Sequence, residues 1–401
     1  MDDSFKGAAI TAGSPELKSL LAAVGEGASR RDQERVHPWD ALTLVRRSRL
    51  GALRLAASEG GGGASARELF AVIIALADAD PNVAHILRNH FSFVERFLRA
   101  SRLAKLEKWR QAVAGGAIFG LAYGELEASQ VGGSEINTVV TPDGDGYRID
   151  GIKYYSTGSL YADYIQVRAR LPDGSFASPV VPTNRAGIEL VDDWDGFGQR
   201  VTGSGTTILR NVRAEADEVV LESDGTFFTQ PYPGAVPQLI LTAVNAGILQ
   251  TVLRDAIALV RGRKRSFTHA PSERPADDPI LQQIVGRVAS DAFAAEATVL
   301  AAADALDRID AARGGSDFEA ALHEAALLAS KAKVIVDELA VRAAGQLLDV
   351  GGASATRAGH NFDRHWRNAR TLATHNPTPY KARAIGDHAV NGTPLPTSGF
   401  F

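Results

Sequence analysis

Residues 142–158, which read PDGDGYRIDGIKYYSTG, contain the strongest β-structure signal in the chain. The opening Pro-Asp-Gly-Asp-Gly is typical of a hairpin turn, because glycine adopts positive φ without steric cost and aspartate hydrogen-bonds to nearby backbone. The stretches 147–152 and 153–157 after this turn predict two strands. Similar short runs, separated by turn residues, extend from about residue 115 to residue 226, so we expect a compact β-barrel or sandwich there.

Helical patterns flank this region on both sides. Before it, Ser65 and Glu68 form the pattern of a capping box, and the apolar spacing of 83–98 predicts a helix whose buried face includes His90. After it, three apolar-periodic runs predict a bundle of long helices, at 239–262, 280–313 and 318–348. We therefore expect an α+β multidomain fold with an N-terminal helical domain (1–114), a middle β-barrel (115–228) and a C-terminal helical bundle (229–401).

The composition limits the classes of function. The 401 residues carry 43 Lys+Arg against 47 Asp+Glu, a formal charge of −4, so we expect no nucleic-acid partner. No stretch approaches the roughly 18–20 apolar residues that span a bilayer, and the acidic start does not match a signal peptide, which predicts a cytoplasmic protein without a membrane partner. Zero cysteines exclude thiolate nucleophiles and Fe–S clusters, and no metal or P-loop motif is present, so we expect no metal site.

Few residues remain that could take part in catalysis or ligand binding, and each of them could instead have a purely structural role. His90 is either a proton donor facing a pocket or a hydrogen-bonded core histidine, and His375 lies where Pro377 interrupts two helical runs. The hydroxyl-bearing residues 154–157 could contact a flat heterocycle or simply favour a strand. The cations at 261–265 could bind a phosphate or stabilise a helix C-terminus. Residues 192–196 are acidic but have the pattern of a solvated loop.

Several motifs together resemble the acyl-CoA dehydrogenase fold over nearly the whole chain. They are Lys153-Tyr-Tyr-Ser-Thr-Gly158 with Ala162-Asp163, the segment 193–206 with Asn211-Val212, and Arg265-Ser266-Phe267. The resemblance implies a homotetramer in which the last motif reaches a neighbouring subunit's flavin. It does not extend to the dehydrogenases' catalytic base, because Asn376 stands where many of them have glutamate and an amide cannot abstract a proton.

The C-terminal segment is instead similar to two-component flavin monooxygenases of the dibenzothiophene monooxygenase type. The similarity lies in 363–371, His375-Asn-Pro377, Tyr380-Lys381 and Asn89-His90-Phe91. It implies that a separate reductase supplies reduced FMN, which reacts with O₂ to a C4a-hydroperoxyflavin that oxygenates a small, largely apolar substrate at sulfur, nitrogen or an aromatic carbon. FAD fits this resemblance less well than FMN.

The same resemblance assigns the site residues. The predicted catalytic residues are His90, His375, Ser156 and Thr157. The predicted cofactor-binding residues are Tyr123, Glu125, Tyr154, Ser156, Lys264, Arg265, Phe267, Gly352, Ser354 and His375. The predicted walls of the substrate pocket are Phe91, Trp194, Phe197 and Asn376.

Two other functions remain open at this stage. An FAD-dependent acyl-CoA dehydrogenase or oxidase would need a catalytic base displaced to another position, and it would bind FAD tightly. A catalytically silent helical-bundle protein that assembles with partners would have no affinity for flavin.

Overall fold

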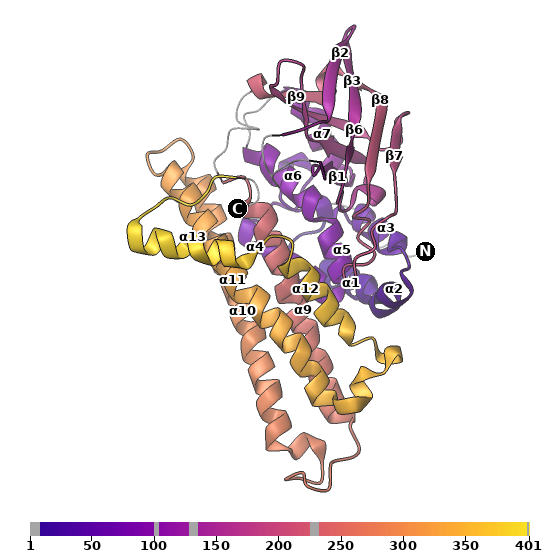
Figure 1. Ribbon diagram of the computed structural model, residues 1–401, viewed down its shortest axis with the longest axis vertical. Helices are drawn as coiled ribbons and strands as arrows, with labels where there is room; N and C mark the ends of the chain where they lie inside the picture. Colours follow the sequence, from indigo (N-terminus) through magenta and orange to yellow (C-terminus); the bar gives the residue numbers. More distant parts are fainter. Residues whose placement is uncertain (1–8, 100–103, 128–134, 225–231, 399–400) are drawn as a thin grey trace.

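A computed structural model of the protein describes residues 9–99, 104–127, 135–224, 232–398 and 401. Helices come first, then a sheet, then a second set of helices, and Figure 1 shows the sheet at one end of an elongated molecule with the long C-terminal helices extending away from it. This is the expected acyl-CoA dehydrogenase-like order. The expected boundary at 228/229 lies outside the described residues.

The described part of the N-terminal region contains seven short α-helices: α1 (Pro15–Gly25), α2 (Ala28–Glu34), α3 (Trp39–Arg47), α4 (Ala66–Ala79), α5 (Pro81–Ile86), α6 (Arg88–Arg99) and α7 (Ala104–Ala114). The capping box is confirmed, since Ser65 Oγ accepts from the Glu68 backbone and the Glu68 side chain accepts from the Ser65 backbone. Such a cap contributes about 1 kcal/mol. The single helix expected over 83–98 is instead two, because the chain leaves α5 at Leu87 and α6 begins at Arg88.

The strands are β1 (Phe119–Ala122), β2 (Val139–Asp143), β3 (Gly146–Lys153), β4 (Tyr164–Val167), β5 (Ala169–Arg170), β6 (Phe176–Pro182), β7 (Ile188–Leu190), β8 (Thr207–Glu215) and β9 (Val219–Leu221). They form one curled sheet in the order β1-β4-β6-β5-β2-β3-β8-β7, with β9 paired to β6. The predicted hairpin is present: Asp143 pairs with Gly146, and Gly144 between them has φ 61°. Among the described residues β1 and β7 stand at the two ends of this order, and the strands of the expected barrel form one curled sheet.

The C-terminal helices are α9 (Ala235–Gly262), α10 (Pro279–Ala312), α11 (Phe318–Gly351), α12 (Asp363–Ala373) and α13 (Thr378–Asn391). α9 packs against α4, α10 and α11 and supplies much of the main hydrophobic core. By length and composition α9 is apolar enough to cross a membrane, but 83% of its most apolar window is buried inside the protein, as expected of a central bundle helix. Its first turns reach the base of the sheet, and this junction forms the site (Figure 1).

Candidate active site

A cavity of about 550 Å³ lies where α5 and α6, the end of β1, the 154–157 segment, the start of α9 and the α12–α13 connection meet. Six of the residues predicted from the sequence line it: Tyr123, Glu125, Tyr154, Thr157, Trp194 and His375. These residues are far apart in the chain, so only the fold brings them together. The cavity is therefore the candidate active site.

One wall of the cavity is a polar stripe along α5 and α6. Its members are His85, Arg88, Asn89, Ser92 and Arg96. Their spacing of three to four residues is that of one helix face, opposite to the apolar stripe of the same segment. Sequence reasoning missed this face because it followed only the apolar positions. The polar positions at the same period were the signal that could have found it.

His85 is the functional candidate that the sequence analysis overlooked. Its Nδ1 lies 3.2 Å from Gln199 Oε1. Because an amide oxygen only accepts, Nδ1 carries the proton and Nε2 has a lone pair, which finds no hydrogen-bond partner among the residues the structure describes. Burial, reinforced by the positive charge of Arg88, lowers the pKa of His85 to about 3. His85 is therefore a neutral base held in one tautomer.

His375 reaches the same cavity from the opposite side. α12 ends at Ala373 and α13 begins at Thr378, because Pro377 cannot continue the first helix. The short connection places His375 in the cavity wall. Desolvation within the cavity wall, followed by the charges of Arg88 and Lys333, lowers the pKa of His375 well below its ordinary value, although the residue as a whole is exposed. The cavity therefore has two neutral histidines beside a buried cation.

His90 does not join them. Its Nε2 donates to the Gly51 carbonyl at 2.9 Å, and its Nδ1 accepts from the Phe119 backbone at 3.2 Å. The ring fits so closely that a Cβ on Gly51 would lie 2.4 Å from Nε2. Both ring nitrogens are thus used to join the Leu50–Ala52 turn to β1, and His90 is absent from the described cavity wall. Its placement corrects the predicted catalytic role and supports the core alternative.

The buried histidines make stability depend on pH. Burial lowers the pKa of His90 to about 4 and that of His85 to about 3, whereas an unfolded histidine titrates near about 6.5. The unfolded chain therefore binds protons first as pH falls, so the stabilisation is complete above about pH 6.5 and is lost below it. We expect each histidine to remove about 2 kcal/mol of unfolding free energy between pH 7 and pH 5.

Urea unfolding at the two pH values measures this loss. Between pH 7 and pH 5, His85→Gln should lose about 2 kcal/mol less unfolding free energy than the wild type loses. The exposed control His360→Gln should lose as much as the wild type. Equal stability of the wild type at both pH values would contradict the assignment of neutral buried histidines.

The segment 154–157 is not the strand we expected. β3 ends at Lys153, Tyr154 forms an isolated bridge with Gly124, and Tyr155 has φ 55°, which turns the chain. The turn exposes Thr157 to the cavity, while Asn89 donates to the Thr157 carbonyl at 2.7 Å. The Ser156 side chain, also predicted to be catalytic, is buried outside the described cavity wall.

Gln199 connects the polar groups of the site. Besides its contact with His85, its carbonyl accepts from Trp194 Nε1 at 2.9 Å and from Thr202 Oγ1 at 2.8 Å. Thr202 Oγ1 lies 2.7 Å from Ser204 Oγ, which lies 2.8 Å from Thr157 Oγ1. Gln199 is fully buried and has φ 53°, a conformation that favours glycine. One strained residue thus links a histidine, an aromatic wall and a hydroxyl chain.

Glu125 lines the cavity but its carboxylate is occupied within the protein. It accepts from Lys153 Nζ at 2.6 Å and from the Thr138 hydroxyl at 2.7 Å. Burial opposes ionisation, but these hydrogen bonds prevail and lower the pKa of Glu125. Burial also lowers the pKa of Lys153, to about 8. The pair therefore fixes the segment after β1 against β2 and β3.

Three predicted pocket walls lie elsewhere. Phe91 is buried in the main hydrophobic core. Phe197 is 54% exposed and stacks on Trp366, with ring centroids 5.9 Å apart. Asn376 is buried, but the described lining of the cavity does not include it. In each of these three cases the direction of the side chain decides whether the residue lines the cavity, and a sequence motif does not determine that direction.

Five other predicted cofactor-binding residues gather at the far end of the bundle. Lys264, Arg265 and Phe267 follow α9, and Gly352 and Ser354 follow α11, on the end opposite the sheet in Figure 1. Arg263 joins the two segments by donating to the Val350 carbonyl at 3.2 Å. Phe267 is 63% exposed. Within one chain these residues do not line the described cavity, so their contact with a flavin requires a second subunit and stays a prediction.

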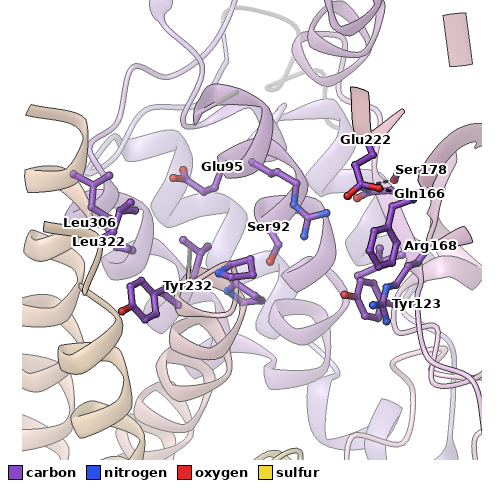
Figure 2. A pocket seen from close by; sticks show the side chains of 18 residues that line it. Ser92, Glu95, Tyr123, Gln166, Arg168, Ser178, Glu222, Tyr232, Leu306 and Leu322 are labelled. Carbon is purple, nitrogen blue, oxygen red and sulfur yellow. Dashed lines mark hydrogen bonds between the residues drawn. The ribbon is translucent and has the colours of Figure 1, made fainter. Parts of the chain in front are cut away.

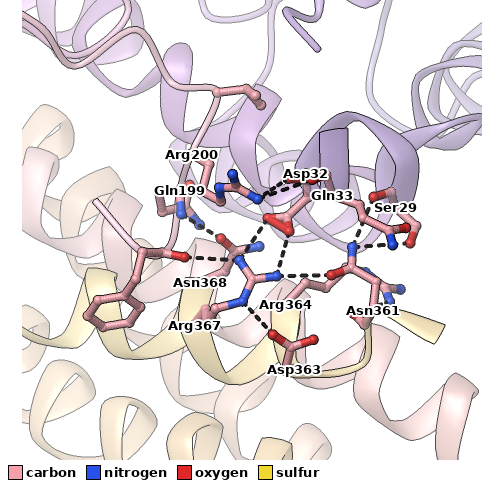
Figure 3. Close-up of polar contacts among 12 residues, drawn as sticks. Ser29, Asp32, Gln33, Gln199, Arg200, Asn361, Asp363, Arg364, Arg367 and Asn368 are labelled. Atoms are coloured by element: carbon pink, nitrogen blue, oxygen red, sulfur yellow. Dashed lines mark hydrogen bonds and ion pairs between the residues drawn. The ribbon is translucent and has the colours of Figure 1, made fainter. Parts of the chain in front are cut away.

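An ion-pair network anchors the Gln199 segment (Figure 3). Arg367 on α12 contacts Asp32 at 2.9 Å and donates to the Phe197 carbonyl at 2.9 Å. Asn368 Oδ1 accepts from the Gln199 backbone at 2.6 Å. Asp32, on α2, is only 1% exposed. The network therefore holds the loop that orients His85 between the first and last thirds of the chain.

Comparison with known proteins agrees with this architecture. A sequence profile described as "Acyl-CoA dehydrogenase, C-terminal domain" matches residues 239–379. The structure of FMN-bound TdsC from Paenibacillus sp. A11-2 is similar, with a TM-score of 0.86 and 28% identity over 96% of this chain and 100% of that one. The fold is thus that of the acyl-CoA dehydrogenase-like flavoproteins.

Relatives found by sequence comparison define the family within this fold more closely. Dibenzothiophene monooxygenase of Rhodococcus qingshengii is 30% identical over 89% of this chain and 87% of its own. The probable FMNH2-dependent monooxygenase SfnC of Pseudomonas putida is 28% identical over 93% of both chains. The protein belongs to the dibenzothiophene monooxygenase family.

Proposed function

We propose that the protein is a two-component monooxygenase that uses reduced FMN from a separate reductase, together with O₂, to oxygenate a small organic substrate at sulfur, nitrogen or an aromatic carbon. The observation that carries the proposal is the pair of neutral histidines, His85 and His375, in one cavity. Family membership supports the choice of FMN and O₂. Bound reduced FMN would supply the electrons that activate O₂.

The residues present fit such a cofactor. Tyr154 and Trp194 offer aromatic surface, Thr157 offers a hydroxyl, and the buried Nε2 of His85 has an unused lone pair. These groups would hold the flavin ring, and Lys264, Arg265 and the backbone near Gly352 would hold its phosphate across a subunit boundary. The proposal therefore includes a homotetramer, and we expect it to work in the cytoplasm beside its reductase.

The two histidines control protons at the cavity wall. His375 and His85 are both neutral, so either can accept a proton from a reacting oxygen atom and return it. Arg88, donating to the Pro237 carbonyl at 3.0 Å, supplies a fixed positive charge beside them. A dehydrogenase would need a carboxylate base, and Glu125, one of the two carboxylates in the described cavity wall, is occupied by Lys153.

Anaerobic titration with reduced FMN and reduced FAD, followed by rapid mixing with oxygenated buffer, tests the proposal. We expect tighter binding of reduced FMN and a slower return of oxidised-flavin absorbance than in free solution. Tight FAD binding together with reduction of that FAD by an acyl-CoA would contradict it.

Gln199→Leu tests how His85 is positioned. Removing the Oε1 acceptor leaves the His85 tautomer undetermined, so we expect oxygenation to fall roughly fivefold, as for loss of one ordinary hydrogen bond. The pH profile of oxygenation should also change, which a purely structural role would not cause. Gln33→Leu is the control, since the Gln33 side chain donates only to the Ala358 carbonyl, at 3.1 Å, among the hydrogen bonds of the described residues. An unchanged profile in Gln199→Leu would contradict the positioning role.

A further inference from the structure

Arg88 differs from the other charged residues in the wall of the candidate active site. It is the first residue of α6, and its side chain lines the cavity together with that of His85. Its Nε donates to the Pro237 carbonyl on α9 at 3.0 Å, which is the one hydrogen bond that its guanidinium makes to any residue the structure describes. A guanidinium has five N–H donors, so those on the two Nη atoms remain for another partner.

The other charged residues of the cavity wall already interact within the chain. Glu125 belongs to a buried ion pair with a contact of 2.6 Å. The Arg168 guanidinium lies 4.5 Å from the centre of the Tyr123 ring. Arg96, Arg168 and Glu135 also have further partners in the protein. Arg88 is therefore the charged group of this wall that is best placed to meet a ligand.

The positive charge of Arg88 is not balanced by the residues around it. The side chain is only partly exposed, and desolvation lowers its pKa to about 10, with no carboxylate of the described residues opposing the shift. An arginine with this pKa is still charged at neutral pH. Removing a charge from water is unfavourable unless an opposite charge pairs with it. Binding an anion at Arg88 would therefore add an interaction that the chain itself does not supply.

Arg88 also lies close to the two candidate catalytic histidines. After desolvation, its positive charge is the next largest cause of the lowered pKa of His85 and of His375. Because the interaction between charges weakens with distance, an effect on both rings places Arg88 near each of them. A group bound to the Nη atoms of Arg88 would therefore lie beside the residues that exchange protons.

Apolar surface surrounds this position. A smaller chamber of about 220 Å³ adjoins the cavity, and Pro237, which anchors Arg88, lines both spaces together with Leu121. Figure 2 shows Leu306 and Leu322 on the side of this chamber that the helical bundle forms. An organic molecule held at Arg88 by a polar group would therefore find apolar surface for the rest of its structure.

We propose that Arg88 determines substrate specificity by binding the anionic head of an organic acid, whose two oxygens accept hydrogen bonds from its two Nη atoms. The guanidinium is a planar fork that matches a carboxylate or sulfinate group, and the bond from Nε to the Pro237 carbonyl holds it in place. The inference rests on the proposed monooxygenase function and narrows its small organic substrate to a small organic anion.

Calorimetric titration of the FMN-saturated protein with benzoate and with benzamide tests this assignment. The two molecules have nearly the same shape and differ in charge. We expect benzoate to bind at least about tenfold more tightly, the effect of one charge-assisted hydrogen-bonded contact. Arg88→Gln should remove this preference. Arg88→Lys should keep part of it, because lysine retains the charge without the planar fork.

Arg200→Gln is the matched control. Arg200 also donates only to backbone carbonyls, those of Asp32 and Gln33, among the hydrogen bonds of the described residues, and it is not part of the described cavity wall. This variant should keep the full preference for benzoate. Equal binding of benzoate and benzamide by the wild type, no binding of benzoate, or a preference that persists in Arg88→Gln would overturn the proposal.

A second set of titrations separates the substrate from the cofactor as the source of the anion. The affinity for reduced FMN is measured in the wild type and in Arg88→Gln, and we expect it to be the same in both. A loss of FMN affinity in Arg88→Gln, or displacement of FMN by benzoate, would assign Arg88 to the cofactor and overturn its role toward substrate. Failure of the monooxygenase function would appear instead as a wild type that does not bind reduced FMN, while the ratio of benzoate to benzamide affinity is still measured without flavin.

Discussion

His375→Ala should lower the rate of substrate oxygenation at least about 100-fold, the usual loss when a group that transfers protons is removed. The variant should still bind reduced FMN, because the aromatic and hydroxyl walls of the cavity remain. The physical reason is that His375 lines the cavity as a neutral imidazole, and the alanine variant has no group at that place that can accept and return a proton. Rapid mixing should show flavin reoxidation continuing while product formation is lost.

Two controls make this result specific. His360→Ala removes an exposed histidine and should leave the oxygenation rate unchanged. His375→Gln fills the space without a titratable group and should remain as inactive as the alanine variant. Full oxygenation activity in His375→Gln would show that proton transfer by this residue is not required.

Arg367→Met should destabilise the folded protein by about 3–5 kcal/mol, the cost of leaving one member of a buried ion pair without its partner. Asp32 is 1% exposed, so its carboxylate cannot turn to water when Arg367 is removed. This loss is a large share of the about 5–15 kcal/mol that stabilises a typical domain. Thermal and urea unfolding measure it directly.

The surface pair Arg210–Glu189 provides the comparison. It has a similar contact distance, 2.8 Å, but its side chains are 68% and 55% exposed. Arg210→Met should therefore cost less than about 1 kcal/mol. Asp32→Asn added to Arg367→Met should recover part of the lost stability by removing the unpaired charge. A loss in Arg367→Met no larger than in Arg210→Met would contradict our interpretation of the buried pair.

The sequence predicted the features that local chemistry determines. Asp143 and Gly146 form the expected hairpin because turn residues act locally, and Ser65 and Glu68 form the expected cap for the same reason. His375 was found because Pro377 marks a helix break next to it. The regular spacing of apolar residues was enough to predict the long helices.

Features that depend on distant contacts were not predicted. The same helical segment carries His85 and His90, and only the packing of Gly51 and Phe119 around His90 decides which one faces the core. The turn at Tyr155 comes directly after β3 and after the bridge between Tyr154 and Gly124, and it contains no glycine or proline that would predict it. The order of the strands in the sheet likewise results from pairing that no local pattern specifies.

The positive φ of Gln199 has an evolutionary consequence. A backbone of this kind costs on the order of 1–3 kcal/mol in a residue with a side chain, and glycine would relieve it. Glycine, however, has no amide with which to hold His85. A library selected only for heat resistance should therefore become enriched in glycine at this position and lose activity as it does so. Selection for activity should keep glutamine there in spite of its backbone.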